Sequence, residues 1–192
     1  EWFEIVPSAP AGVRWVRGWD LAASDPTKKQ GDPDYTAGVK VGIHAGTIYI
    51  GHAIRGQLSS GKVEKMIKNT ASQDGYGTAI DLPQDPGQAG KSQVRYLISQ
   101  LMGYTVHHST ETGDKVTRAD PVASQAEAGN IKVVAGPWND DFLDEVEMFP
   151  NGAHDDQVDA MSRGFARLIV PESTGDIAAP MLISGGSYVP EY

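Results

Sequence analysis

Apolar and polar positions along the chain follow two different periods, and together they predict a mixture of strands and helices. Runs rich in Val, Ile, Tyr and Thr with a period of two residues are typical of strands, whereas apolar residues three or four positions apart are typical of one buried helix face. The predicted strands are residues 13–22, 35–43, 47–54, 78–82 and 104–108. The predicted helices are residues 58–72, 88–102, 119–128 and 155–169.

The order of these elements predicts an α/β fold built on one mixed sheet. The second and third strands are joined by His44-Ala45-Gly46, which is a hairpin signal, so the first three strands are expected to be antiparallel. Helices connect the later strands, which favours parallel pairing with helices flanking the sheet. Right-handed crossovers then place the first and fourth predicted strands side by side.

The segment from Asn151 to Ile169 combines an apolar helix face with a cluster of acids. Asp155 is expected to be the N-cap, and Asp156 and Asp159 fall in the first turn. Acids there stabilise the helix dipole, but three like charges beside a buried face also repel one another. The cluster is interpreted either as helix capping or as one side of a divalent-cation site. The apolar face consists of Val158, Met161, Phe165 and Ile169.

Two further acids are predicted to lie near that cluster. Asp20 ends the first strand, and Asp85 follows the fourth strand. If these strands are parallel neighbours, their carboxyl ends place both acids in the crevice where open α/β sheets bind ligands. The last helix can then pack across the sheet and bring Asp156 and Asp159 to the same place. Four carboxylates from three distant segments are therefore expected to meet.

Composition supports a single globular domain that uses oxygen ligands for any metal. The chain has 192 residues, of which 40% are hydrophobic and 21% charged, and no apolar run is long enough to span a bilayer. Zero cysteines exclude thiolate sites, and the five histidines show no zinc spacing, which leaves a hard cation on carboxylates. Residues 1–12 are expected to be a linker, residues 13–170 the domain, and residues 171–192 a flexible tail.

The net charge of −9 argues against a protein that binds nucleic acid over its whole surface, but the basic residues are grouped locally. The group from Lys62 to Lys68 has helical spacing and is interpreted as a solvated face. Lys115 and Arg118 stand in a glycine-containing loop before a predicted helix. Either they contact phosphate or developing negative charge, or they belong to an ordinary solvated loop.

Five motifs, taken in order, are similar to a known family. They are RGWDLAAS at 17–24, DYTA at 34–37, PQDPGQAGKSQ at 83–93, GDKVTRADPVASQAEAGNI at 113–131 and FPNGAHDDQVDAMS at 149–162. Together they resemble the C-terminal nuclease domain of the terminase large subunit of tailed bacteriophages, which is a ribonuclease-H-like endonuclease. The resemblance covers most of residues 13–169.

The resemblance implies a metal-dependent endonuclease that cuts concatemeric double-stranded viral DNA during genome packaging. It also implies two Mg²⁺ or Mn²⁺ ions, which activate water and neutralise the leaving oxygen in phosphodiester hydrolysis. Asp20 matches the first acid of the family and Asp85 the second, with Asp81 as the alternative second acid. The acids of the last helix, Asp155, Asp156 and Asp159, supply the third position and are not ranked.

The same resemblance implies partners and supporting residues. The partners are double-stranded DNA, an ATPase domain of the same full-length protein, the small terminase subunit and the portal protein, with no membrane. The expected location is the host cytoplasm, transiently at the procapsid portal. Lys115, Arg118 and Lys91 are expected near DNA. His154 either tunes a metal-bound water or only shapes the turn before the last helix.

Two other functions remain open from the sequence. The same fold can serve as a non-cleaving DNA clamp or docking module within the packaging motor, although the acid cluster argues against that role. Another ribonuclease-H-like enzyme, such as a junction resolvase, shares the acids but is not expected to carry the QDPGQAGK and GDKVTRA motifs. Fold alone does not separate these functions.

Overall fold

The structure is a computed structural model that describes residues 2–22 and 32–170. The predicted flexible tail, 171–192, and most of the loop after Asp20 lie outside the described residues. The described strands are β1 (Glu4–Val6), β2 (Arg14–Asp20), β3 (Thr36–His44), β4 (Thr47–Gly56), β5 (Thr78–Pro83), β6 (Val106–Ser109) and β7 (Ile131–Val134). The described helices are α1 (Ser60–Asp74), α2 (Gln88–Gln100), α3 (Lys115–Glu127), α4 (Asn139–Met148) and α5 (Asp156–Ile169).

The strands of the described chain form one sheet in the order β1-β7-β4-β3-β2-β5-β6. Strands β2, β3 and β4 are antiparallel to one another, and every other pairing is parallel. The predicted mixed sheet is therefore confirmed. The first and fourth predicted strands, β2 and β5, are parallel neighbours, with Gly18 beside Asp81.

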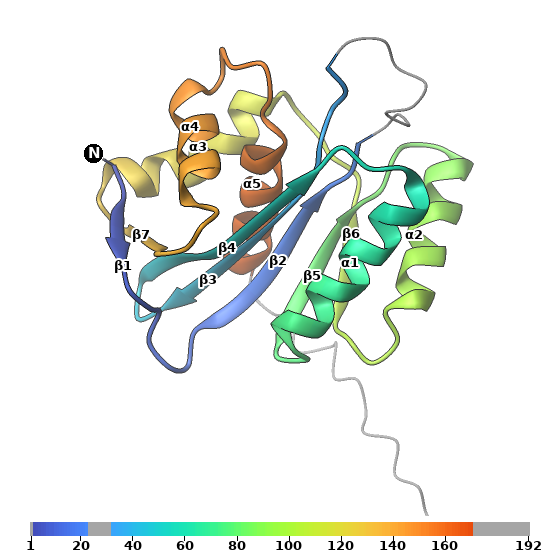
Figure 1. The fold of residues 1–192 in the computed structure, drawn as a ribbon, viewed down its shortest axis with the longest axis horizontal. Helices are drawn as coiled ribbons and strands as arrows, with labels where there is room; N and C mark the ends of the chain where they lie inside the picture. The colour runs from blue at the N-terminus through green and yellow to red at the C-terminus, as the bar shows by residue number, and fades with distance from the viewer. Residues whose placement is uncertain (1, 23–31, 171–192) are drawn as a thin grey trace, which may run out of the picture.

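Helices cover both faces of the sheet. Helices α1 and α2 lie on one face, and α3, α4 and α5 lie on the other (Figure 1). The first face buries Trp19 of β2 with Ile67 and Leu97, whereas the second buries Val16 of β2 with Phe142 and Phe165. Alternate residues of β2 thus enter opposite cores, as the pleat of a strand requires. None of the helices in the described chain has the length and apolar character needed to cross a membrane.

Two strands, β1 and β7, were not predicted from the sequence. β7 pairs with β4, and β1, which falls in the predicted linker 1–12, pairs in parallel with β7. Part of this linker is therefore the edge strand of the sheet. Both strands are short, of four residues or fewer, so their pairing partners rather than their own periodicity define them.

Helix α3 begins at Lys115 instead of at residue 119, so the GDKVTRA motif is the start of a helix rather than a loop before one. Asp114 is the N-cap, and its carboxylate accepts a hydrogen bond from the backbone N–H of Thr117 at 2.9 Å. Pro121 lies inside the helix and obscured this start, because a proline is usual only in the first turn.

Helix α5 lies directly against β2 and β3 because two glycines leave room for it. A Cβ added at Gly18 would lie 2.2 Å from the carbonyl oxygen of Ala160 and 2.5 Å from the backbone nitrogen of Gly164. Backbone atoms cannot rotate away as a side chain does, so any larger residue at Gly18 must push the helix off the sheet. Every residue from Asp156 to Phe165 is buried in consequence.

We expect Gly18→Ala to lower the free energy of unfolding by about 1–3 kcal/mol, because the added methyl group overpacks the contact between β2 and α5. Gly61→Ala is the matched control, since nothing lies within 4 Å of a Cβ at that position in α1. The control is expected to raise stability by about 0.5–1 kcal/mol through helix propensity. Urea unfolding of both variants measures the difference, and equal stability of the two would contradict the close packing.

Candidate functional site

The acids that the sequence singles out lie at the carboxyl-end edge of the sheet. Asp20 is the last residue of β2, and it lies on the same face as Gly18, toward α5. Asp156 and Asp159 are in the first turn of α5, and both are buried. The close packing of α5 on β2 therefore places these acids beside one another.

The surroundings of Asp20 strongly disfavour its negative charge. Burial and the neighbouring carboxylates of Asp159, Asp156 and Glu111 raise the pKa of Asp20 to about 8, against a smaller opposing effect of Arg163. Desolvation is the largest cause, and repulsion by like charges is the next. An acid held in this way is stabilised by any cation that joins it.

The pKa values of Asp156 and Asp159 in α5 are raised, as is that of Asp20. Burial raises the pKa of Asp156 to about 6, although the backbone N–H of Tyr35 donates a hydrogen bond to its carboxylate. Burial also raises the pKa of Asp159, although Arg118 donates a hydrogen bond to it at 2.8 Å. The site is therefore a place where buried negative charge is only partly compensated.

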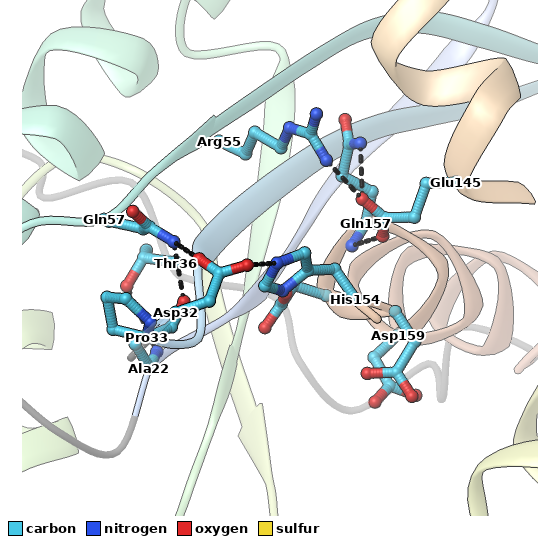
Figure 2. Close-up of polar contacts among 12 residues, drawn as sticks. Ala22, Asp32, Pro33, Thr36, Arg55, Gln57, Glu145, His154, Gln157 and Asp159 are labelled. Atoms are coloured by element: carbon cyan, nitrogen blue, oxygen red, sulfur yellow. Dashed lines mark hydrogen bonds and ion pairs between the residues drawn. The ribbon is translucent and has the colours of Figure 1, made fainter. Parts of the chain in front are cut away.

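Glu145 of α4, rather than Asp155, caps helix α5. Its carboxylate accepts hydrogen bonds from the backbone N–H of Gln157 at 2.6 Å and from the Gln157 side-chain amide at 2.7 Å. Arg55 donates to the same carboxylate at 2.9 Å, as Figure 2 shows. Asp155 does occupy the N-cap position, but its side chain makes no capping hydrogen bond. Asp155 is thus available to another partner.

Basic residues of α3 pair with the acids of α5. The Nζ of Lys115 lies 2.6 Å from Oδ1 of Asp155 and 3.8 Å from Oδ2 of Asp159. The Nη2 of Arg118 lies between Asp159, at 2.8 Å, and Glu111, at 3.3 Å. The GDKVTRA motif therefore supplies the positive charge beside the acid cluster.

Glu111 and Arg163 belong to the site but were not found from the sequence. Glu111 follows the carboxyl end of β6, and Arg163 donates to it at 2.6 Å while also contacting Oγ of Ser109 at 3.0 Å. Two features of the sequence and its predicted fold could have identified these residues. β6 ends at the same edge as β5, and Arg163 stands four positions after Asp159 on the same face of α5.

Asp81, the alternative second acid, has another role. It is buried in β5, where its carboxylate is 3.1 Å from Nη1 of Arg163 and 2.6 Å from Nε of Arg167. These two arginines neutralise Asp81 and tie β5 to α5. The alternative of Asp81 as a metal ligand is therefore not supported by its contacts.

Asp85 lines the same cleft as Asp20. The cleft has a volume of about 360 Å³, and Asp20, Asp85 and Glu111 line it together with residues of α2. Asp85 is exposed, and it is not among the charges that raise the pKa of Asp20. Lys91 is exposed on α2, outside the residues that line this cleft. The roles of Asp85 and Lys91 stay predictions.

The expected meeting of four carboxylates at one point is not found. Among residues 2–22 and 32–170, no three acid or histidine side chains are close enough together to enclose a metal ion. Asp155 and Asp159 are paired with Lys115 and Arg118 instead, and Asp85 faces the cleft from the loop between β5 and α2. The chemistry of the donors nevertheless fits a hard divalent cation, because Asp20, Asp156 and Asp159 present carboxylate oxygens whose negative charge is only partly compensated.

His154 is held beside the acids by a contact that the sequence did not predict. Its Nε2 lies 2.6 Å from Oδ2 of Asp32, and its Nδ1 lies 3.7 Å from Oδ2 of Asp156. Figure 2 shows Asp32 between His154 and Gln57, whose side-chain amide donates to Asp32 at 2.7 Å. The segment just before β3 is thereby fixed against the start of α5.

Comparisons with known proteins agree on the family and the fold. A family model described as the terminase RNaseH-like domain matches residues 17–168. No curated protein sequence matches the chain significantly.

Solved structures of viral terminase nucleases are similar in fold to this chain. The large terminase nuclease from thermophilic phage G20c with bound zinc is 17% identical, with a TM-score of 0.61 over 86% of this chain and 94% of that chain. The same nuclease with bound magnesium is 15% identical, with a TM-score of 0.61 over 86% and 93%. The manganese-soaked, inhibitor-bound human cytomegalovirus terminase nuclease domain is 14% identical, with a TM-score of 0.60 over 82% and 85%. These structures bear out the predicted ribonuclease-H-like fold.

The raised pKa of Asp20 predicts how stability depends on pH. Folding favours the neutral form of this acid, so its contribution to stability is fully present below pH 4 and is lost as the pH rises through about 8. Asp20→Asn keeps a neutral group at every pH. We therefore expect the variant to match the wild type at pH 4 and to exceed its free energy of unfolding by about 2–5 kcal/mol at pH 9.

The measurement is urea unfolding at a series of pH values in a buffer containing EDTA. Asp144→Asn, which changes an exposed acid of α4, is the control and is expected to show no such trend. A difference between Asp20→Asn and the wild type that stays constant from acidic to alkaline pH would contradict the raised pKa.

Proposed function

Because the chain belongs to the family of terminase RNaseH-like domains, we propose that it is a divalent-metal-dependent endonuclease that cuts concatemeric double-stranded DNA during viral genome packaging. The observation that carries this proposal is the burial of Asp20 among Asp156, Asp159 and Glu111 at the carboxyl edge of the sheet. Such a concentration of carboxylates destabilises the protein by itself, so a function that brings a cation there accounts for it.

The residues that would hold the cations are Asp20, Asp156 and Asp159. Each is buried or nearly so, each has a raised pKa, and Asp20 interacts with the other two. Asp155 ranks below them because it is more exposed and is already bonded to Lys115. Asp85 and Glu111 face the cleft beside Asp20 and complete the acidic surroundings.

Two bound Mg²⁺ or Mn²⁺ ions would activate a water molecule and neutralise the leaving oxygen of the scissile phosphate. The chain itself would hold the acids in fixed positions for that chemistry. Asp20 ends a strand that is paired on both sides and is itself paired with Ala37 of β3, and the acids of α5 are fixed by burial. The neighbours solved with magnesium, zinc and manganese support a divalent cation of this kind.

Lys115 and Arg118 would contact the phosphate backbone at the rim of the site. Both are partly exposed and each already bridges carboxylates of α5 or Glu111. A phosphate entering beside these acids therefore meets fixed positive charge, which positions the DNA without reading its sequence.

The proposed setting is the packaging motor. The domain would act on DNA delivered by an ATPase domain of the same full-length protein, with the small terminase subunit and the portal protein as partners, in the host cytoplasm. The net charge of −9 means that the domain alone would bind DNA weakly, and the assembled motor would supply the avidity.

Plasmid cleavage by the purified protein tests the proposal. With Mn²⁺ or Mg²⁺ we expect cutting that EDTA abolishes and that Asp20→Asn lowers by about 100-fold or more, since cation binding at the site is lost. Asp144→Asn should cut at the wild-type rate. Mn²⁺ should also raise the melting temperature of the wild type at pH 8 and leave that of Asp20→Asn unchanged.

Two results would contradict this proposal. The first is equal cutting by the wild type and Asp20→Asn. The second is DNA binding without cutting in either metal, which would favour a clamp or docking module in the motor.

A further inference from the structure

The edge of the sheet that carries Asp20 is also the edge at which α1 and α2 begin. Ala37 of β3 pairs with Asp20 on one side and with Arg55 of β4 on the other, so β4 ends level with Asp20. Helix α1 begins four residues after β4, and α2 begins five residues after β5, which is the parallel neighbour of β2. The first turns of both helices therefore lie at this edge, on the face of the sheet opposite α5 (Figure 1).

These two helices carry an excess of positive charge on one continuous surface. They lie side by side, because the hydroxyl of Tyr96 donates to Oε2 of Glu64 at 3.0 Å and Nζ of Lys68 donates to Oε1 of Gln100 at 3.4 Å. Together the helices contain two acids and five basic residues. We call these five residues the α1–α2 basic face; they are Lys62, Lys65, Lys68, Lys91 and Arg95.

The two acids of these helices do not neutralise this face. Oδ2 of Asp74 lies 2.8 Å from Nε of Arg17, and its Oδ1 lies 3.2 Å from Nζ of Lys40, so this carboxylate serves the sheet. Glu64 lies 3.7 Å from Lys68 and compensates that residue alone. The other four cations are exposed and form no ion pair within the described part of the chain; they are Lys62, Lys65, Lys91 and Arg95.

The stability of the helices does not account for these cations. Lys62 is the third residue of α1 and Lys91 the fourth of α2, and neither helix has an acid in its first turn. The positive end of the helix dipole lies there, so a lysine at either position is unfavourable for the helix itself. A negatively charged partner at this edge would reverse the sign of that effect.

The opposite face of the sheet has the reverse charge. Helix α4 contains five acids and no basic residue; the acids are Asp140, Asp141, Asp144, Glu145 and Glu147. The helix lies close to the site, because Glu145 caps α5. A polyanion that reaches the site is therefore repelled from the side of α4 and attracted to the side of α1 and α2. The net charge of −9 conceals this asymmetry.

We propose that the DNA duplex bound at Asp20 continues over the α1–α2 basic face, where the four unpaired cations contact phosphates of its backbone. The inference rests on the proposed nuclease function for the nature of the ligand, and it adds the direction in which the duplex leaves the site, away from α4. It assigns a role to Lys62 and Lys65, which the helical spacing alone indicates only as a solvated face. Phosphate contacts carry no sequence information, so this face holds DNA of any sequence.

The experiment is binding of the purified protein to short fluorescein-labelled duplexes of two sequences, followed by anisotropy in EDTA, which prevents cutting. The association constant is measured between about 25 and 150 mM salt, because its slope against salt counts the phosphate contacts. One double variant carries Lys62→Gln and Lys65→Gln, and the other carries Lys91→Gln and Arg95→Gln. The matched control is Lys132→Glu on β7, which changes the net charge by the same amount outside both helices.

We expect each double variant to reduce the logarithmic salt slope by about 2 and to weaken binding by about 10- to 50-fold at about 0.1 M salt, equally for both sequences. Lys132→Glu should keep the wild-type slope. A wild-type slope in either double variant would overturn the proposal. An equal fall in Lys132→Glu would also overturn it, since binding would then follow the net charge rather than the position of the cations.

A second measurement locates the DNA directly. Because the sequence contains no cysteine, an environment-sensitive dye can be attached to a single introduced thiol. Gly61→Cys places it in the first turn of α1, where nothing lies within 4 Å of a Cβ, and Asp144→Cys places it on the exposed side of α4. Added duplex should change the emission of the dye at position 61 and not at position 144. The same response at both positions, or a response at 144 alone, would contradict the proposed direction.

The outcomes separate this inference from the proposed nuclease. If the wild type cuts no DNA but both double variants lose salt slope, the nuclease fails and the α1–α2 basic face stands as a DNA-binding surface. If the wild type cuts DNA and the slopes do not change, the basic face fails and the nuclease stands.

Discussion

The close contact of α5 with β2 is the constraint on which the site depends. Gly18 and Gly164 remove the side chains that would otherwise separate helix from sheet, and the backbone of α5 then lies directly on β2. The close approach of α5 to β2 brings the carboxylates of Asp156 and Asp159 near enough to Asp20 to raise its pKa. The same contact buries all of α5 from Asp156 to Phe165, which desolvates the acids and raises their pKa values. Packing and electrostatics therefore have a common origin in two residues without side chains.

The positive charges around the acids come from two helices, and the two helices neutralise different aspartates. Arg163 and Arg167 of α5 neutralise Asp81 and so tie the middle of β5 to the helix. Lys115 and Arg118 of α3 neutralise Asp155 and part of Asp159. Asp20 receives no such partner among the described contacts and stays the least compensated acid. The fold thus neutralises the acids that hold its elements together and leaves the negative charge of the acid at the strand end strongly disfavoured.

The sequence predicted the fold well and the site in part. The strands β2 to β6 and the helix α5 have strong periodicity of their own, so their types, their order and the adjacency of β2 and β5 followed from the pattern. β1 and β7 were missed because short strands exist only through their neighbours. The proximity of Asp20, Asp156 and Asp159 was predicted because strand ends and helix periodicity place them. Glu145 and Asp32 were missed because their partners lie far away in the chain, at Gln157 and His154, and no local pattern records such contacts.

The burial of α5 also has a consequence for motion. Amide groups in a helix buried from Asp156 to Phe165 exchange with solvent only when a large part of the core opens, whereas the rim formed by α3 and the loop at Glu111 is more exposed. The two halves of the site therefore differ in how freely they fluctuate. The acids on β2 and α5 form the more rigid half, and Lys115, Arg118 and Glu111 lie in the half that fluctuates more freely.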